Sequence, residues 1–269
     1  MLPLHIAQLA DGAVSFVETG TGTPVIFLHG IGSSARSWQA AFEVAPPDWH
    51  ALAWNAPGYP PSTPLAADWP SASDYAQRLK TLLDARDINS AHLVGHSLGC
   101  LIAARFANLY PSCVKSLTLA SCALGHARLP EDERARLLAS RLVDVEELGA
   151  RAMAEKRGPR LLGPNATAAQ IRAVIDTMAS IDAQGYAQGA RMLSKGDLIG
   201  DIEKLPVDLP VQFIYGSADV ITPPEANQQA VAARPLAPVT VLELAGHACY
   251  IEQPQAFMTA VQGFVSQHA

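Results

Sequence analysis

The chain has 269 residues, of which 49% are hydrophobic and 16% charged, so it can bury a large core as one domain or as a domain with an insertion. The formal net charge of -6 and the lack of a Lys/Arg run argue against a nucleic-acid partner. No apolar run approaches the roughly 18 residues of a membrane span and the N-terminus lacks a signal-peptide pattern, so we expect a cytoplasmic protein with no membrane partner.

The first half of the chain alternates predicted strands and helices. An Asp11-Gly12 turn between two alternating apolar segments predicts an antiparallel hairpin at the N-terminus. Fully apolar segments follow, which are typical of parallel strands buried on both faces. The predicted elements are strands at 24–28, 50–54, 91–94 and 114–120, and helices at 73–87 and from Leu98 to Leu109. This order predicts an α/β fold built from repeated β-α units.

The pattern changes between residues 123 and 205. Periodic segments at 131–143, 146–157 and 167–183 follow one another with no strand between them. The strand-helix alternation returns with strands at 211–215 and 239–244 and a closing helix at 254–267. We therefore predict a core made of residues 1–122 and 206–269, with residues 123–205 inserted as a helical cap.

The segment Gly95-His96-Ser97-Leu98-Gly99 lies between a predicted buried strand and a predicted helix. A serine on so sharp a turn needs small neighbours, because strand and helix approach closely there, and Gly95 and Gly99 meet that need. The alternative is a glycine-bounded loop with an incidental serine. The strand before and the helix after favour Ser97 as a nucleophile.

A serine nucleophile needs a base, and the base needs a group that fixes its tautomer. His247 follows the predicted strand at 239–244, and Asp219 follows the strand at 211–215, where open α/β sheets place their ligands. Alternatively, His247 is a loop histidine bonded to a carbonyl, and Asp219 caps a turn or helix. The joint placement of Ser97, Asp219 and His247 favours a catalytic triad.

The predicted strand at 24–28 leads into His29-Gly30-Ile31-Gly32. The backbone N–H groups of Ile31 and Leu98 could form the oxyanion hole that carbonyl attack requires. The alternative, a dinucleotide-binding turn, lacks the third glycine of that motif. We expect no cofactor.

Four cysteines, Cys100, Cys113, Cys122 and Cys249, are scattered and form no C-x-x-C pair. We expect them to be reduced, because a chain with a large core has little need of disulfides. His247 and Cys249 lie close together but offer too few ligands for zinc, so we expect no metal.

With these motifs in this order, the chain resembles the α/β-hydrolase family over nearly its whole length. The resemblance rests on residues 28–32 with Ser37-Trp38, 95–99, 216–219 with Thr222-Pro223, and 245–247. It implies a mostly parallel eight-stranded sheet with helices on both faces, a helical cap, and the roles given above for the triad and the oxyanion hole. Asn55 departs from the family, which often has aspartate there, but the position is usually structural.

A looser similarity connects the chain to 3-oxoadipate enol-lactonases and related esterases. The segments that carry it are 185–197, 222–224 and 252–254. The leading hypothesis is a cofactor-independent serine hydrolase whose partner is a small ester or lactone. The alternatives are a meta-cleavage-type C–C bond hydrolase with the same triad and a hydrolase-fold small-molecule receptor with slow turnover. The sequence carries no signal of oligomeric state.

Three residues are candidates for substrate binding. His29 and Gly30 follow the third predicted strand, and Arg191 lies in a mostly apolar stretch near the end of the predicted cap. An inward-facing Arg191 could bind a substrate carboxylate in bidentate fashion. Alternatively, its stem packs along the cap and its head reaches solvent or an acid such as Asp197.

Overall fold

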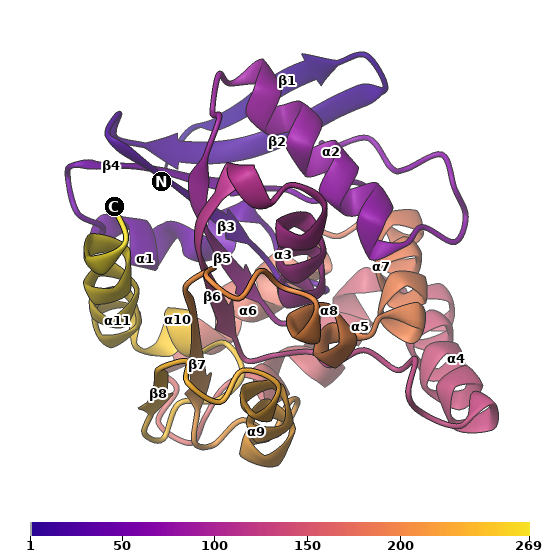
Figure 1. Cartoon of the computed structure of the whole chain (residues 1–269). Helices are drawn as coiled ribbons and strands as arrows, with labels where there is room; N and C mark the ends of the chain where they lie inside the picture. The colour runs from indigo at the N-terminus through magenta and orange to yellow at the C-terminus, as the bar shows by residue number, and fades with distance from the viewer. Residues whose placement is uncertain (1) are drawn as a thin grey trace.

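The computed structural model describes residues 2–269, which form an eight-stranded sheet between two layers of helices (Figure 1). The strand order is β1-β2-β4-β3-β5-β6-β7-β8; β2 is antiparallel to both of its neighbours, β1 and β4, and the other neighbouring strands are parallel. The strands are β1 Leu4–Leu9, β2 Gly12–Thr19, β3 Thr23–Leu28, β4 Trp49–Trp54, β5 Ala91–His96, β6 Val114–Ala120, β7 Val211–Gly216 and β8 Val239–Leu242. The mostly parallel sheet and the opening hairpin agree with the prediction.

The helices cover both faces of this sheet. They are η1 Ala35–Trp38, α1 Gln39–Glu43, α2 Ala72–Ala85, α3 Leu98–Leu109, η2 Pro111–Cys113, α4 Glu131–Glu147, α5 Gly149–Arg157, η3 Gly158–Leu161, α6 Ala168–Ala179, α7 Ala183–Lys195, α8 Leu198–Glu203, α9 Pro224–Ala232, α10 Cys249–Glu252 and α11 Pro254–Gln267. None of the helices in residues 2–269 combines the length and the apolar character needed to cross a bilayer.

Alternation along the strands divides the core into two parts. In β3, Ile26 and Leu28 face a cluster that includes α2 and α3, whereas Val25 and Phe27 face a cluster that includes α1 and α11. Because strand side chains point alternately to opposite faces, a strand buried on both sides needs apolar residues throughout. This arrangement holds the carboxyl ends of the parallel strands rigidly in place.

Helices α4 to α8 lie between β6 and β7, where the sequence predicts the cap. The last of them, α8, packs against α3 of the sheet layer. Arg105 of α3 forms a salt bridge of 2.7 Å with the buried Asp201 of α8, and Asn108 donates to the Asp201 carbonyl. In its packing, α8 therefore belongs with the helices that cover the sheet, although it falls inside the predicted cap.

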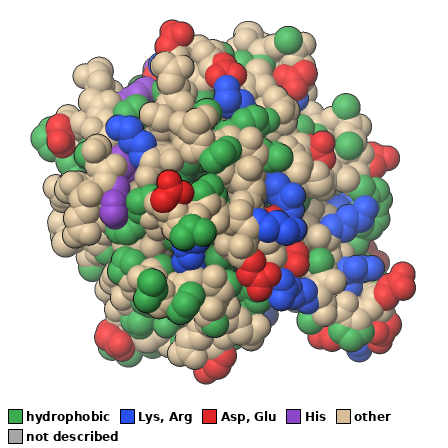
Figure 2. Space-filling view, viewed as in Figure 1, with side chains coloured by type: hydrophobic (Ala, Val, Ile, Leu, Met, Phe, Trp, Pro, Cys, Tyr) green, Lys and Arg blue, Asp and Glu red, His purple; other side chains and the backbone are tan. Residues whose placement is uncertain are grey.

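Charges of both signs are distributed over the surface. On the face drawn in Figure 2, acidic and basic side chains lie interspersed among apolar and polar ones. This distribution fits the modest net charge of -6.

Acid should destabilise the fold partly through His92, a buried residue of β5 whose Nδ1 lies 2.7 Å from Ser116 Oγ. Burial, helped by the charges of Lys115 and His268, lowers the pKa of His92 to about 4. In the unfolded chain the imidazole takes up its proton near its ordinary value, so stability falls as pH drops from that value towards about 4.

We expect His92→Gln to reduce this acid sensitivity. Between pH 7 and pH 5, the wild type should lose about 2 kcal/mol more unfolding free energy than the variant. Urea unfolding of both proteins at the two pH values measures this difference. A change in packing caused by the substitution affects the variant equally at both pH values and so drops out of the comparison. Equal losses in both proteins would show that His92 does not contribute.

Candidate active site

Ser97 lies on a sharp turn between β5, which ends at His96, and α3, which begins at Leu98. Its φ of 53° and ψ of -114° are unusual for a residue other than glycine. A Cβ at Gly99 would lie 2.2 Å from the Leu28 carbonyl oxygen, and one at Gly95 would lie 2.6 Å from the Gly99 carbonyl oxygen. The flanking glycines therefore permit the close approach of strand and helix that the sequence predicts.

The structure brings His247 and Asp219 together from two different loops. His247 Nδ1 lies 2.9 Å from Asp219 Oδ2, and both side chains are buried. Thr222 Oγ1 donates to the same carboxylate oxygen at 2.8 Å and lies 3.0 Å from His247 Nδ1. With Nδ1–H directed at the carboxylate, Nε2 of His247 is left as the available acceptor.

Asp219 also organises its own loop. Its Oδ1 accepts hydrogen bonds from the backbone N–H groups of Ile221 and Thr222 at 2.8 and 2.9 Å. Burial raises the pKa of this carboxyl, but the facing His247 and the hydrogen bonds from His247 and Thr222 outweigh burial and hold the pKa below its usual value. Asp219 thus serves as a turn cap and as an ionised partner of His247.

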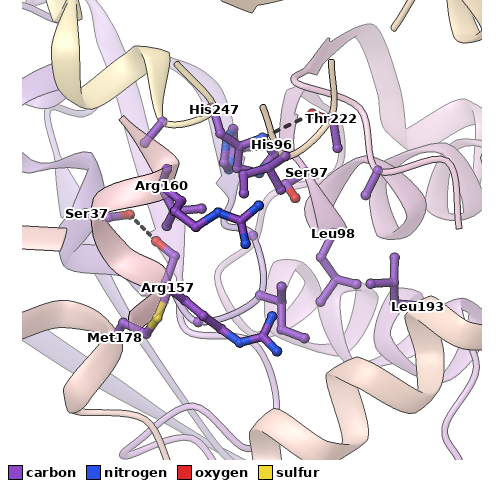
Figure 3. Close-up of a pocket in the computed structure, with 18 of the residues that line it drawn as sticks. Ser37, His96, Ser97, Leu98, Arg157, Arg160, Met178, Leu193, Thr222 and His247 are labelled. Carbon is purple, nitrogen blue, oxygen red and sulfur yellow. Dashed lines mark hydrogen bonds between the residues drawn. The ribbon is translucent and has the colours of Figure 1, made fainter. Parts of the chain in front are cut away.

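Ser97 and His247 line the same cavity, which has a volume of about 260 Å³ (Figure 3). Ser97 Oγ makes no hydrogen bond with any residue between 2 and 269. Catalytic hydrogen bonds are often long or poorly aligned before substrate binds. The hydroxyl is therefore free to meet a ligand in the cavity.

Ile31 and Leu98 line the same cavity. Leu98 is the first residue of α3, so its N–H has no acceptor within the helix. Neither N–H donates to an acceptor in the described part of the chain. Two free donors beside a serine hydroxyl could bind an oxygen that gains negative charge.

His29 does not lie where the sequence predicts. It is buried, and Gly30 lines the cavity but His29 does not. Its Nδ1–H donates to the Gly30 carbonyl at 2.8 Å, and its Nε2 accepts from the Ala56 N–H at 3.0 Å. Burial, partly offset by the Gly30 bond, lowers the pKa of His29 to about 4. With both ring nitrogens engaged, His29 connects the Gly30 carbonyl and the Ala56 N–H.

His96 supports the other side of the site. Its Nε2–H donates to the His247 carbonyl at 2.8 Å, which fixes the loop that carries His247. Burial, with the charge of His247 acting in the same direction, lowers the pKa of His96 to about 3. His96 is therefore neutral at physiological pH and acts on the site through His247.

Asn55 has a structural position, as predicted. Its Oδ1 accepts from the Ala35 N–H at 2.7 Å, and its Nδ2 donates to Ser15 Oγ at 2.8 Å. These bonds connect the end of β4 to η1 and β2. Asparagine satisfies both partners, because its amide provides one acceptor and one donor where an ionised aspartate would provide acceptors only.

Arg191 lies outside the cavity, which departs from its prediction as a carboxylate ligand. Its Nη1 donates to the Asp68 carbonyl at 3.0 Å, and its guanidinium carbon lies 5.5 Å from the centre of the Trp69 ring. Asp197, the other partner considered, pairs with Arg128 at 2.8 Å. The side chain of Arg191 connects α7 to the loop that precedes α2.

Three other arginines of the helical insertion do line the cavity. They are Arg141 of α4, Arg157 at the end of α5, and Arg160 of η3. In Figure 3, Arg157 and Arg160 extend into the hollow that Ser97 and Leu98 face. No sequence motif marks these arginines, because their position depends on how α4 and α5 pack over the sheet.

The comparisons with known proteins agree with the fold. The (E)-2-((N-methylformamido)methylene)succinate hydrolase of Acinetobacter baylyi is 21% identical, with 96% of each chain covered. Among solved structures, a thermophilic esterase from Thermogutta terrifontis has a TM-score of 0.86 at 22% identity, covering 99% of this chain and 100% of that one. The enol-lactonase from Burkholderia xenovorans LB400 has a TM-score of 0.84 at 18% identity, covering 97% of this chain and 100% of that one. The model of the alpha/beta hydrolase family matches residues 25–260, and the chain belongs to this family.

Proposed function

We propose that this hydrolase cleaves a small ester or lactone through an acyl-enzyme formed at Ser97. The observation that carries the proposal is that Ser97, His247, Ile31 and Leu98 line one cavity, with Asp219 bonded to His247 and the N–H groups of Ile31 and Leu98 free of acceptors in residues 2–269. Each group supplies one requirement of acyl transfer: a nucleophile, a base with a fixed tautomer, and stabilisation of the oxyanion.

In the proposed reaction, Ser97 Oγ attacks the substrate carbonyl carbon while His247 Nε2 takes the serine proton. The carbonyl oxygen becomes an oxyanion and accepts hydrogen bonds from the N–H groups of Ile31 and Leu98. The carbon–oxygen bond of the ester then breaks, and His247 returns its proton to the leaving alcohol, which in a lactone stays attached to the acyl group. Water, deprotonated by His247, releases the acid and restores Ser97.

The names of the similar proteins support a hydrolase function of this kind. One relative is named as a hydrolase of an N-methylformamido compound, and the two structural neighbours are named as an esterase and an enol-lactonase. The cavity of about 260 Å³ favours small substrates.

A substrate panel tests the proposal. It contains p-nitrophenyl esters of graded acyl length, several lactones, and a ring-fission dienone as a probe of C–C bond hydrolysis. We expect the highest kcat/KM on short esters or lactones, because a cavity of about 260 Å³ cannot enclose a long acyl chain. Turnover of the dienone with no turnover of any ester or lactone would contradict the proposal.

The proposal also predicts how the rate depends on pH. Asp219 stays ionised because its pKa is held below the usual value, so the acidic limb should come from the imidazole of His247, which accepts the serine proton only when neutral. The value of kcat/KM should therefore fall on the acidic side of the profile, because a protonated imidazole cannot take the serine proton.

His126 provides a control for this profile, because it also lines the cavity, and burial together with the charge of Arg141 lowers its pKa. His126→Gln should leave the position of the acidic limb unchanged, whatever its effect on the rate. Loss of the limb in this variant would assign the titration to His126 instead of His247.

A further inference from the structure

The charged side chains that line the cavity are all cationic. Arg141, Arg157 and Arg160 contribute to the lining, whereas none of its residues is an aspartate or a glutamate. Asp219 does not line the cavity, and its carboxylate faces His247 Nδ1 at 2.9 Å. Apart from histidines, the remaining lining is neutral and includes apolar side chains such as Leu98, Met178 and Leu193. The cavity therefore has an apolar part and a cationic part.

Arg157 is held in place by a counterion. Its Nε donates to Asp144 Oδ2 at 2.6 Å, and Lys156 Nζ donates to Asp144 Oδ1 at 2.8 Å. Asp144 is buried, and the hydrogen bond from Lys156 is the main cause that lowers its pKa, with Arg157 acting in the same direction. Lys156 and Arg157 thus share the single negative charge of Asp144. Arg157 is held in place, and its positive charge is only partly balanced.

Arg141 and Arg160 have no such counterion. Neither makes a salt bridge with any carboxylate in residues 2–269. Arg141 lies three residues before Asp144 on α4 and is half-buried, and its charge acts on the pKa values of His126 and Tyr59. Arg141 is partly withdrawn from water without an anionic partner, which is unfavourable, and a bound anion would relieve that cost. Arg160 is exposed, so it enters the argument through its place at the cavity and its lack of a counterion.

The local backbone directs Arg157 and Arg160 to the same side. Arg157 is the N-cap of η3, and Arg160 lies three residues later within it. A 3-10 helix has three residues per turn, so side chains three apart lie one above the other. Figure 3 shows both side chains extending from this segment into the hollow that holds Ser97 and His247.

We propose that Arg141 and Arg160, with Arg157 beside them, form an anion subsite, so that the preferred substrate is an ester or lactone that carries a carboxylate on its acyl part. The planar fork of a guanidinium matches the two oxygens of a carboxylate. The inference rests on the proposed serine hydrolase function, because the subsite would hold the acyl chain while Ser97 attacks its carbonyl.

Two matched substrates test the charge preference. Mono-p-nitrophenyl adipate carries a free carboxylate, and its methyl ester has the same acyl chain without the charge. After subtraction of the uncatalysed rates, wild type should show a kcat/KM for the free acid at least 10-fold above that for the methyl ester. Arg160→Met and Arg141→Met should each lower kcat/KM for the free acid by about 10- to 100-fold, the loss expected for a charged hydrogen bond, and change the methyl ester less than about 3-fold.

Arg191→Met is the matched control, because Arg191 is an arginine of the same insertion that lies outside the cavity. Arg191→Met should keep the wild-type preference for the free acid over the methyl ester. Arg160→Lys, which keeps a positive charge, should show more of this preference than Arg160→Met. Arg157→Met is avoided because it would leave the buried Asp144 with Lys156 alone. Glutarate should inhibit the wild type, whereas phosphate at equal ionic strength should not. Inhibition by glutarate should be weaker in the Arg160→Met variant.

The outcomes separate the two proposals. Hydrolysis of both esters at equal kcat/KM, or equal losses on both in the Arg160 and Arg141 variants, would overturn the anion subsite and leave the serine hydrolase standing. Inhibition by phosphate but not by glutarate would overturn the assignment to a carboxylate. No hydrolysis of either ester, with no labelling of Ser97 by a phosphonate, would overturn the proposed function itself.

Discussion

Ser97→Ala is expected to lower kcat by about 10³- to 10⁶-fold on any ester or lactone that the wild type hydrolyses. The variant lacks the nucleophile, so the acyl-enzyme cannot form. Folding should be preserved, because Ser97 Oγ makes no hydrogen bond within residues 2–269 and alanine keeps the Cβ. The measurement is steady-state kinetics together with thermal unfolding.

Ser121→Ala provides a matched control for this variant. Ser121 is also a buried serine with a positive φ, 45°, directly after a strand, but it does not line the cavity. Its removal should leave kcat within a few-fold of the wild type. Full activity of Ser97→Ala in a preparation free of wild-type enzyme would show that another group is the nucleophile.

Asp219→Asn should lower kcat by roughly 10⁴-fold with little change in KM, if Asp219 orients His247 as in the serine-protease template. The amide can still accept the N–H groups of Ile221 and Thr222 through its oxygen, so the loop should keep its shape. It would donate towards His247 Nδ1, however, and so favour the tautomer with the proton on Nε2. That tautomer cannot accept the proton of Ser97.

Asp197→Asn tests whether losing a capping carboxylate is enough to reduce the rate. Asp197 caps α8 by accepting the Gly200 N–H at 3.0 Å, much as Asp219 caps its turn, but it lies outside the cavity. This variant should retain activity. A nearly wild-type kcat in Asp219→Asn would assign the orienting role to another group.

The sequence predicts the strands and the turn at Ser97 well, because those segments carry strong local signals. Buried strands are uniformly apolar, and the elbow needs glycine on both sides. The end of β8 was harder to predict: the apolar pattern continues to Leu244, but the strand stops at Leu242. Leu244 has a φ of 61°, and the chain turns there, so that the Ala245 carbonyl accepts a hydrogen bond from the Ala218 N–H at 2.9 Å.

Within the insertion, the periodic pattern predicts helices but not where they end. The pattern suggests one helix over 167–183, whereas the structure has α6 to Ala179 and a separate α7 from Ala183. Asp182 begins α7 by accepting the Gly185 N–H at 3.0 Å. The break at residues 180–182 depends on this helix cap, and the spacing of apolar residues does not reveal it.

Which arginine faces the cavity could not be predicted from the sequence. Arg191 has the apolar neighbours expected of an inward-facing residue, yet the Asp68 carbonyl and the Trp69 ring hold it outside the cavity. Arg160 has no such sequence context and is directed into the cavity by η3. The outcome depends on how the insertion packs against the loop before α2, which is a property of tertiary structure.

The most direct test of the central claim is to locate the covalent adduct that a serine-directed p-nitrophenyl phosphonate leaves on the wild-type protein. Peptide mass spectrometry should place one adduct on Ser97, formed in step with loss of esterase activity, and none on the Ser97→Ala variant. Labelling of a different residue in step with that loss of activity, or complete inactivation with Ser97 unmodified, would contradict the account.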